Sequence, residues 1–89
     1  MKAFITVMGK DTVGVIAKVS GLCSELSINI EDVTQSILQE MFAMIMLVDI
    51  SACPISAEDA RTKFNDLGHE MGMEINLTRQ EVFDAMHKI

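Results

Sequence analysis

The spacing of hydrophobic and polar residues predicts a strand at the start of the chain, followed by a helix. Residues 2–8 alternate between apolar and polar side chains, as a half-buried strand requires. Two glycines and two side chains that cap helices, Asp11 and Thr12, then interrupt the alternation. Helical spacing follows at Val15, Val19, Leu22 and Leu26. We therefore expect a helix that starts near Asp11 or Thr12 and ends at about Ser27.

Two further strands are predicted in the middle of the chain. From Asn29 the pattern becomes β-like again, with Val33 and Ile37 on one face and mostly polar neighbours, which is typical of an edge strand. Residues 41–50 are apolar on nearly every position, so both faces of this strand should be covered. It should therefore be a central strand, and some other element must cover its second face.

The last third of the chain predicts a helix, a fourth strand and a helical tail. Ser56 and the acidic residues after it form a capping box, and Gly72 is a natural helix end. Residues 73–78 alternate as a strand, and Val82, Met86 and Ile89 share one side of a short helix. The order βαββαβ predicts an α+β, ferredoxin-like sandwich with both main helices on one face of an antiparallel sheet. We expect one domain over residues 1–80 and a C-terminal helical tail over 81–89.

Composition and charge narrow the class of partner. The chain has 89 residues, of which 49% are hydrophobic, so it is long enough for one packed core. Its formal net charge is −6 and its pI is about 4.6, so it should repel phosphates and not bind nucleic acid directly. The longest apolar stretch, residues 41–48, is too short to span a membrane. We expect a soluble, cytoplasmic protein whose two cysteines stay reduced.

The residue patterns of enzymes and metal sites are nearly absent. His69 and His87 have no partner at metal-ligand spacing, and Cys23 falls among apolar helix positions where a thiol is buried and inert. Glu31 and Asp32 could act as an acid and a base, but neighbours on a strand point to opposite faces. We therefore predict a protein that is not an enzyme and has no cofactor and no metal.

Eight methionines raise the possibility of a thioether copper site. Of Met41, Met44 and Met46, only the last two share a strand face, and no cysteine pair accompanies them. Filling of the core by an adaptable side chain is the better interpretation for these methionines.

The segment from Met8 to Gly14, together with Asn29, is the remaining candidate for a site. A loop that enters a helix presents unpaired backbone N–H groups and the positive end of the helix dipole, which suits a small carboxylate. Gly14 lacks a side chain where such a ligand would approach, and Asn29 offers a donor and an acceptor. The alternative is structural, with a capped helix start and Gly14 needed for packing against the sheet.

Two consecutive motifs resemble the signature of ACT domains. The run Lys10-Asp11-Thr12-Val13-Gly14-Val15 resembles the family's D-x-x-G-hydrophobic start of the first helix, and Ser27-Ile28-Asn29-Ile30 resembles its step into the second strand. The resemblance covers residues 2–80. It is closest to small stand-alone single-ACT proteins, and similar to the ACT portion of the glycine cleavage system transcriptional repressor.

The resemblance implies that a small effector, most often an amino acid, binds at a subunit interface. Gly14 would let the ligand approach, and Asn29 would contact it from the adjacent subunit. Asp11 takes a polar loop position that is often Asn, and Val13 replaces a frequent proline. The expected ligand-binding residues are Asp11, Thr12, Val13, Gly14, Asn29 and Ile30.

The resemblance also implies a homodimer, built either by edge pairing or by packing sheets face to face. The leading hypothesis is a regulatory or sensor module that binds an amino acid or related metabolite between subunits. A second hypothesis is a ligand-free interaction module whose partner is an enzyme or a transcription regulator. A small-molecule enzyme that uses Asp11 or Glu31 is a third hypothesis.

Overall fold

A computed structural model describes residues 1–10 and 13–86, and it has the element order predicted from the sequence. The four strands and three helices follow one another as β1, α1, β2, β3, α2, β4 and α3. Their bounds are β1 Lys2–Lys10, α1 Val15–Glu25, β2 Asn29–Leu38, β3 Met41–Asp49, α2 Ala57–Met71, β4 Glu74–Arg79 and α3 Gln80–Met86.

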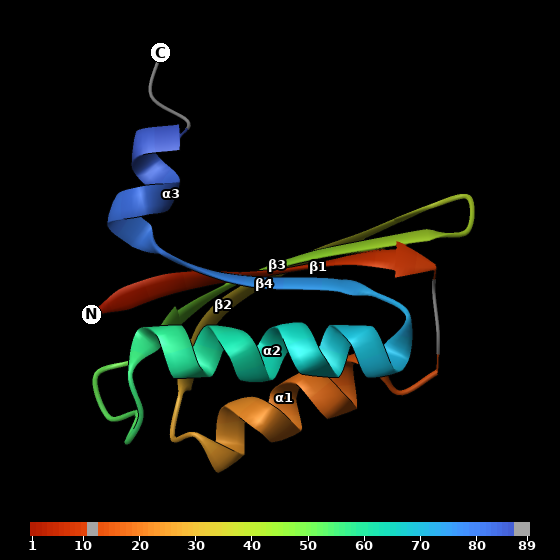
Figure 1. Ribbon diagram of the computed structural model, residues 1–89. Coiled ribbons are helices and arrows are strands. Elements are labelled where there is room, and N and C mark those ends of the chain that lie inside the picture. Colours follow the sequence, from red (N-terminus) through yellow and green to blue (C-terminus); the bar gives the residue numbers. More distant parts are fainter. Residues whose placement is uncertain (11–12, 87–89) are drawn as a thin grey trace.

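The four strands form one antiparallel sheet in the order β2-β3-β1-β4. Figure 1 shows α1 and α2 side by side on one face of this sheet, whereas α3 stands on the opposite side at the end where β4 finishes. This is the predicted ferredoxin-like sandwich, with β1 and β3 in the centre and β2 as an edge strand.

The alternation in β1 and β3 places the core between the sheet and the two helices. Ala3, Ile5 and Val7 of β1 are fully buried beneath the helices. Because paired residues of antiparallel strands point to the same face, Met44, Met46 and Val48 of β3 join them. The largest contribution from a helix is Phe64 of α2, which has no exposed surface. A core of this kind on one face leaves the other face of the sheet to be covered by something else.

Helix α2 has the start and the end that its sequence predicts. The Ser56 hydroxyl accepts a hydrogen bond from the Asp59 backbone N–H at 3.1 Å, which caps the first turn. Gly72 ends the helix in a left-handed conformation, with φ at 68°. Inside the helix, a Cβ added at Gly68 would lie 2.7 Å from the Met73 carbonyl oxygen, so this glycine allows α2 to approach β4 closely.

Helix α1 starts later than predicted. Its N-cap is Gly14, with φ at 88° and no side-chain cap, and the first helical residue is Val15. The start expected near Asp11 or Thr12 is therefore three or four residues too early, because a left-handed glycine, and not a capping side chain, turns the chain into the helix. At the other end Ser27 is left-handed, with φ at 55°, in agreement with the predicted helix end.

The methionines divide between the core and the surface. Met44 and Met46 are 1% exposed and fill the core, as predicted. Met41 was also expected to be a core residue, and this expectation is wrong, because its side chain is on the other face of β3 and is 52% exposed. The alternation of the strand separates it from its two neighbours.

Candidate functional site

The first half of the predicted site lies where β1 ends and α1 begins. Val13 is 99% exposed, and Gly14 is also exposed. The Gly14 carbonyl accepts the first hydrogen bond of the helix, from the Lys18 N–H at 2.9 Å. The two other predicted loop residues, Asp11 and Thr12, lie outside the described residues.

The surroundings of Gly14 decide between two explanations for this glycine. A Cβ built at this position meets no atom within 4 Å, so the glycine is not needed for packing against the sheet. Its φ of 88° is the structural requirement, because L-residues with a side chain rarely adopt it.

The second half of the predicted site lies at the start of β2. Asn29 is exposed and Ile30 is half-buried. Asn29 pairs with Asp49 of β3, which in turn pairs with Lys2 of β1, so the three residues form a row across the sheet. A bulge between Ile30 and Asp32 then shifts the register of β2.

The two halves lie at opposite ends of the sheet in one chain. Asn29 is level with Lys2 at the start of β1, whereas Gly14 comes four residues after Lys10 at its end. A strand rises about 3.3 Å per residue, so the length of β1 separates the two halves by roughly 25 Å. A small ligand cannot touch both halves within a single chain.

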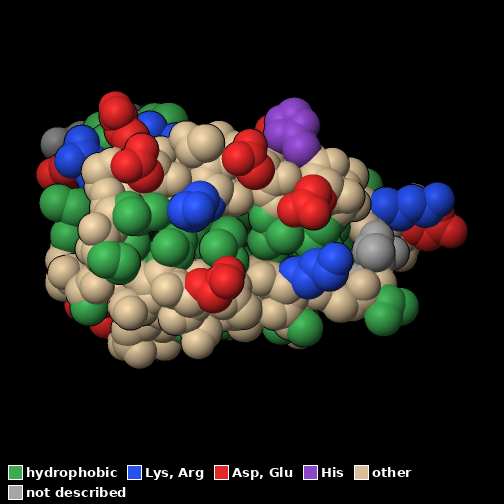
Figure 2. Space-filling view, turned by 60° about the horizontal axis from the view of Figure 1, so that its bottom comes forward, with side chains coloured by type: hydrophobic (Ala, Val, Ile, Leu, Met, Phe, Trp, Pro, Cys, Tyr) green, Lys and Arg blue, Asp and Glu red, His purple; other side chains and the backbone are tan. Residues whose placement is uncertain are grey.

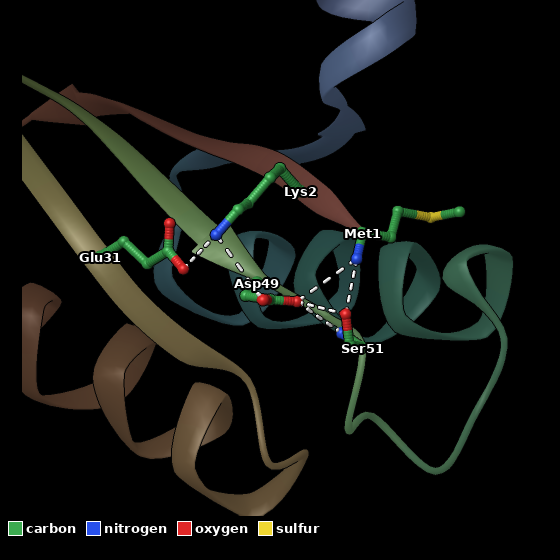
Figure 3. Close-up of polar contacts among 5 residues, drawn as sticks. All are labelled: Met1, Lys2, Glu31, Asp49 and Ser51. Atoms are coloured by element: carbon green, nitrogen blue, oxygen red, sulfur yellow. Dashed lines mark hydrogen bonds and ion pairs between the residues drawn. The ribbon is translucent and has the colours of Figure 1, made fainter.

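A cluster of polar contacts surrounds the Asn29 end of the sheet (Figure 3). The Lys2 ammonium donates to the Glu31 carboxylate and lies 3.6 Å from an Asp49 carboxylate oxygen. The other Asp49 oxygen accepts from the Ser51 N–H at 2.9 Å and from the Ser51 hydroxyl at 2.6 Å. The Met1 ammonium lies 3.5 Å from the same oxygen. These contacts join the ends of β1, β2 and β3.

The cluster shifts the pKa of two of its members. The two hydrogen bonds from Ser51 hold the pKa of Asp49 well below its usual value, with smaller contributions from the Met1 and Lys2 ammonium groups. The hydrogen bond to Glu31 raises the pKa of Lys2. Both groups therefore stay charged at neutral pH. The sequence does not predict this cluster, because its members come together only through the strand register.

A separate groove runs between α1 and α2, on the surface of the helix layer that points away from the sheet. Figure 2 shows apolar side chains along this groove with charged side chains on both rims. Its volume is about 590 Å³, with Leu22 and Leu67 among its lining residues. Lys18 and Glu25 lie on one rim, and Lys63, Asp66 and Glu70 on the other. Of the predicted ligand-binding residues that the structure describes, which are Val13, Gly14, Asn29 and Ile30, none lines this groove.

The described residues considered for metal binding form no common site. Within residues 1–10 and 13–86, no three His, Cys, Asp or Glu side chains form a group that could hold a metal ion. His69 is exposed on α2, and His87 lies outside the described residues. Cys23 is buried, and both cysteines are free. Among the described helices, none is long and apolar enough to cross a membrane.

Comparison with known proteins identifies the family. Residues 2–78 match the ACT domain family, and the chain belongs to it. A UPF0237 protein of Clostridium acetobutylicum is 43% identical over 89 residues, which is the full length of both chains. An ACT domain protein from Streptococcus pneumoniae has a solved structure with a TM-score of 0.82 and 38% identity, and the match covers 93% of each chain.

A more distant structure agrees in fold. A putative glycine cleavage system transcriptional repressor matches with a TM-score of 0.74 and 22% identity, over 89% of this chain and 45% of the other. ACT domains are in general regulatory ligand-binding modules and not catalytic ones, and they commonly bind small effectors and dimerise.

Proposed function

We propose that this protein is a non-enzymatic regulatory module that binds an amino acid or a related small metabolite between two subunits of a homodimer. The proposal rests on one observation. The two halves of the predicted site, at Gly14 and at Asn29, lie at opposite ends of the sheet within one chain. Each chain then holds two half-sites, and a second chain is needed to complete either of them.

The free edge of the sheet supports this arrangement. β2 is an edge strand of ten residues that contains neither lysine nor proline, the residues that commonly block edge pairing. Val33 and Ile37 are 45% and 58% exposed. They pair with Met46 and Phe42 of the core, so they face the helix side of the sheet. Pairing of this edge with the same edge of a second copy would bury them.

Antiparallel pairing of two β2 edges completes the site. Around a two-fold axis, the start of one β2 lies beside the end of the other. The end of β2 is at the same end of the sheet as Gly14, and α1 packs on the β2 side of the molecule. The start of β2 in one chain would thereby lie level with the helix start of its partner, with the Asn29 side chain on the same face of the sheet as Lys2 and Asp49. A ligand in this position contacts both chains and stabilises the dimer.

The chemistry of the two halves suits an amino acid. The backbone N–H groups at the start of α1 favour a carboxylate. Asn29 offers an acceptor for an ammonium group, whereas the nearby carboxylates of Glu31 and Asp49 are already paired with the Lys2 ammonium. The Asp11 carboxylate in the loop sequence acts against a ligand carboxylate, and this favours the alternative function, a ligand-free module that binds an enzyme or a transcription regulator.

A thermal-shift screen against the twenty amino acids and several 2-oxo acids tests the proposal. A ligand at 100 times its dissociation constant adds about 2.7 kcal/mol, which raises the midpoint of a domain of this size by roughly ten degrees or more. Asn29→Ala should weaken binding by about 0.5–1.5 kcal/mol for each lost hydrogen bond. A panel without any shift would contradict the effector function and favour the ligand-free module.

A further inference from the structure

The groove between α1 and α2 is lined by the same sequence pattern on both helices. On α1 the lining residues follow K-x-x-G-L-x-x-E over residues 18–25, and on α2 they follow K-x-x-D-L-x-x-E over residues 63–70. Positions i, i+3, i+4 and i+7 share one face of a helix. Each helix therefore presents a lysine, a leucine and a glutamate to the groove, in this order along the chain.

The two helices run in opposite directions along this groove (Figure 1). Lys18 therefore lies at the same end as Glu70, and Lys63 lies at the same end as Glu25. Figure 2 shows both signs of charge on each rim, with apolar side chains between the rims. Within the described part of the chain, none of these four side chains forms an ion pair. Their charges are available to a molecule that covers the groove.

Gly21 lines the groove, and the fold of one chain does not require a glycine there. Glycine in the interior of a helix is less stable than alanine. At Gly68 a glycine has a structural reason, because α2 packs closely on β4. At Gly21 a Cβ would meet no atom within 4 Å, and the residue is exposed. Gly21 therefore leaves room for a side chain that comes from outside the chain.

We propose that the groove binds the groove of a second copy, with α1 of each copy lying over α2 of the other. The two-fold axis would run along the groove, so it keeps the two ends in place and exchanges the two helices. Lys18 then lies opposite Glu70 of the second copy, and Lys63 lies opposite Glu25 of the second copy.

The same rotation fills the space at Gly21. Gly21 is three residues from Lys18, and Leu67 is three residues from Glu70, so the two are level along the groove. Leu67 of the second copy therefore lies above Gly21 and occupies the room that the glycine leaves.

Charge complementarity favours a second copy over an unrelated helix. Because the pattern repeats on two antiparallel helices, one rotation places four lysines opposite four glutamates. A single helix from another protein would meet one lysine and one glutamate at each end of the groove, which selects neither sign of charge. The groove holds two lysines and three acidic residues, a net charge of −1, whereas the whole chain carries −6. The groove therefore contributes little to the repulsion between two acidic chains.

The remaining acidic residues decide the direction of the axis. Asp66 is the one charged lining residue without an equivalent on α1, where Gly21 takes its place. An axis across the groove would also place lysines opposite glutamates, but it would bring the two Asp66 carboxylates together. The axis along the groove keeps them on opposite sides. Asp59, one turn before Lys63, then falls past Glu25, the last residue of α1, and faces no helix of the second copy.

The size of this contact predicts weak, reversible association. The eleven residues of α1 span about 16 Å, and two helices side by side are about 20 Å wide, which gives roughly 320 Å² on each copy. The total of about 640 Å² is below the range of stable interfaces. Attraction between exposed charges weakens as the salt concentration rises. We therefore expect self-association that increases with protein concentration and decreases with salt.

This contact goes beyond the proposed effector site and uses a different part of the molecule. Edge pairing would use β2, whereas the groove lies on the outer surface of the helix layer. Both contacts can form in one assembly. Val33→Glu on the β2 edge should remove the effector-site dimer and leave association through the groove, so the two proposals fail separately.

Sedimentation equilibrium of the purified full chain at increasing protein concentration tests the charge pairs. Lys18→Glu and Glu70→Lys should each weaken self-association roughly tenfold, because two of the four charge pairs become repulsive. An equal mixture of the two variants should associate as the wild type does, because the reversed charges face each other in the mixed dimer. Glu58→Lys, at an exposed position of α2 outside the groove, makes the same charge change as Glu70→Lys and should leave association unchanged.

Three results would each overturn the proposal. The first is a folded Val33→Glu chain that stays monomeric at every concentration. The second is wild-type association in both Lys18→Glu and Glu70→Lys. The third is a mixture of these two variants that associates no more strongly than either variant alone, because α1 then does not lie over α2 of the second copy.

Gly21→Gln tests the contact with Leu67. Glutamine favours the helix and fills the space above Gly21. At low protein concentration the variant should therefore resist urea at least as well as the wild type, whereas its self-association should be roughly tenfold weaker. Wild-type self-association in Gly21→Gln would contradict the proposed packing of the two grooves.

Discussion

The rings of Phe4 and Phe83 lie with their centroids 4.4 Å apart and their planes inclined by 33°. Phe4 belongs to β1, and Phe83 belongs to the last helix of the chain. This pair attaches α3 to the side of the sheet opposite the two main helices (Figure 1). The Phe4–Phe83 contact therefore determines which part of this face of the sheet α3 covers within one chain.

Removal of the Phe83 ring should detach α3 from the sheet. Aromatic pairs contribute about 0.5–1.5 kcal/mol beyond the area that they bury, so we expect Phe83→Ala to lower the free energy of unfolding by about 1–2 kcal/mol. Urea unfolding followed by circular dichroism measures this change. Asp84→Ala, at an exposed position of the same helix, is the control and should have little effect. Equal stability of the two variants would contradict the role of the aromatic pair.

Two helical glycines should respond to alanine in opposite directions. At Gly68 of α2 a Cβ would lie 2.7 Å from the Met73 carbonyl oxygen and 3.1 Å from the Ile75 backbone nitrogen, so Gly68→Ala must push the helix away from β4. We expect a loss of about 1–3 kcal/mol. At Gly21 of α1 a Cβ meets nothing within 4 Å, so Gly21→Ala should gain about 0.5–1 kcal/mol from helix propensity. Chemical denaturation of both variants checks the signs, and a stabilised Gly68→Ala would refute the close packing.

The carboxylate of Asp49 should make stability depend on acidic pH. Its pKa in the folded chain is depressed below the ordinary value of 3.8, chiefly by the two Ser51 hydrogen bonds. A depressed pKa gives stability that is fully present above the ordinary value and is lost as the pH falls below about 4. Asp49→Asn should therefore flatten the fall of the melting temperature between pH 5 and pH 2.5, relative to an Asp66→Asn control. Parallel curves for wild type and Asp49→Asn would contradict this explanation.

The two cysteines should differ in reactivity. Burial raises the pKa of the Cys23 thiol to about 11, and the thiolate is the reactive form. Cys53 is half-buried near the end of β3. Titration of the native protein with a thiol reagent at pH 7 should modify Cys53 and leave Cys23 unmodified until the protein is denatured. Rapid reaction of both thiols in the folded state would show that the core opens around α1.

The fold could be predicted because the spacing of hydrophobic residues changes clearly between the strands, where they alternate, and the helices, where they recur every three to four residues. The alternation in residues 2–8 and the capping box at Ser56 each depend on neighbouring residues, and both predictions are confirmed. The start of α1 was missed because a left-handed glycine, which the sequence does not distinguish from a flexible one, replaces the side-chain cap. Met41 was misplaced because the apolar run 41–50 predicts a cover on both faces of β3, whereas α1 and α2 cover only one of them.

The candidate site could be predicted only in part. The motifs around Gly14 and Asn29 indicate the residues, but strand order and register decide that the two lie at opposite ends of one sheet. The contacts among Lys2, Glu31 and Asp49 likewise depend on the register of three strands. No local sequence pattern indicates how two chains pair. The role of the six named residues in ligand binding therefore remains a prediction.

Two variants prepare a test of the shared site. Asn adopts the left-handed conformation at low cost, so Gly14→Asn keeps the backbone and adds a side chain where the ligand would approach. Asn29→Ala removes the polar group from the other half of the site. With the effector identified by the thermal-shift screen, each variant should fold, form dimers and bind the effector poorly.

Mixing the two defective variants and counting effector sites by titration calorimetry tests the central claim most directly. If Gly14 and Asn29 of different chains form one site, each mixed dimer holds one site with both changes and one site with neither. After subunit exchange, the mixture should recover about one quarter of the wild-type sites with wild-type affinity. A mixture that binds no more than the separate variants would contradict a site shared between two chains.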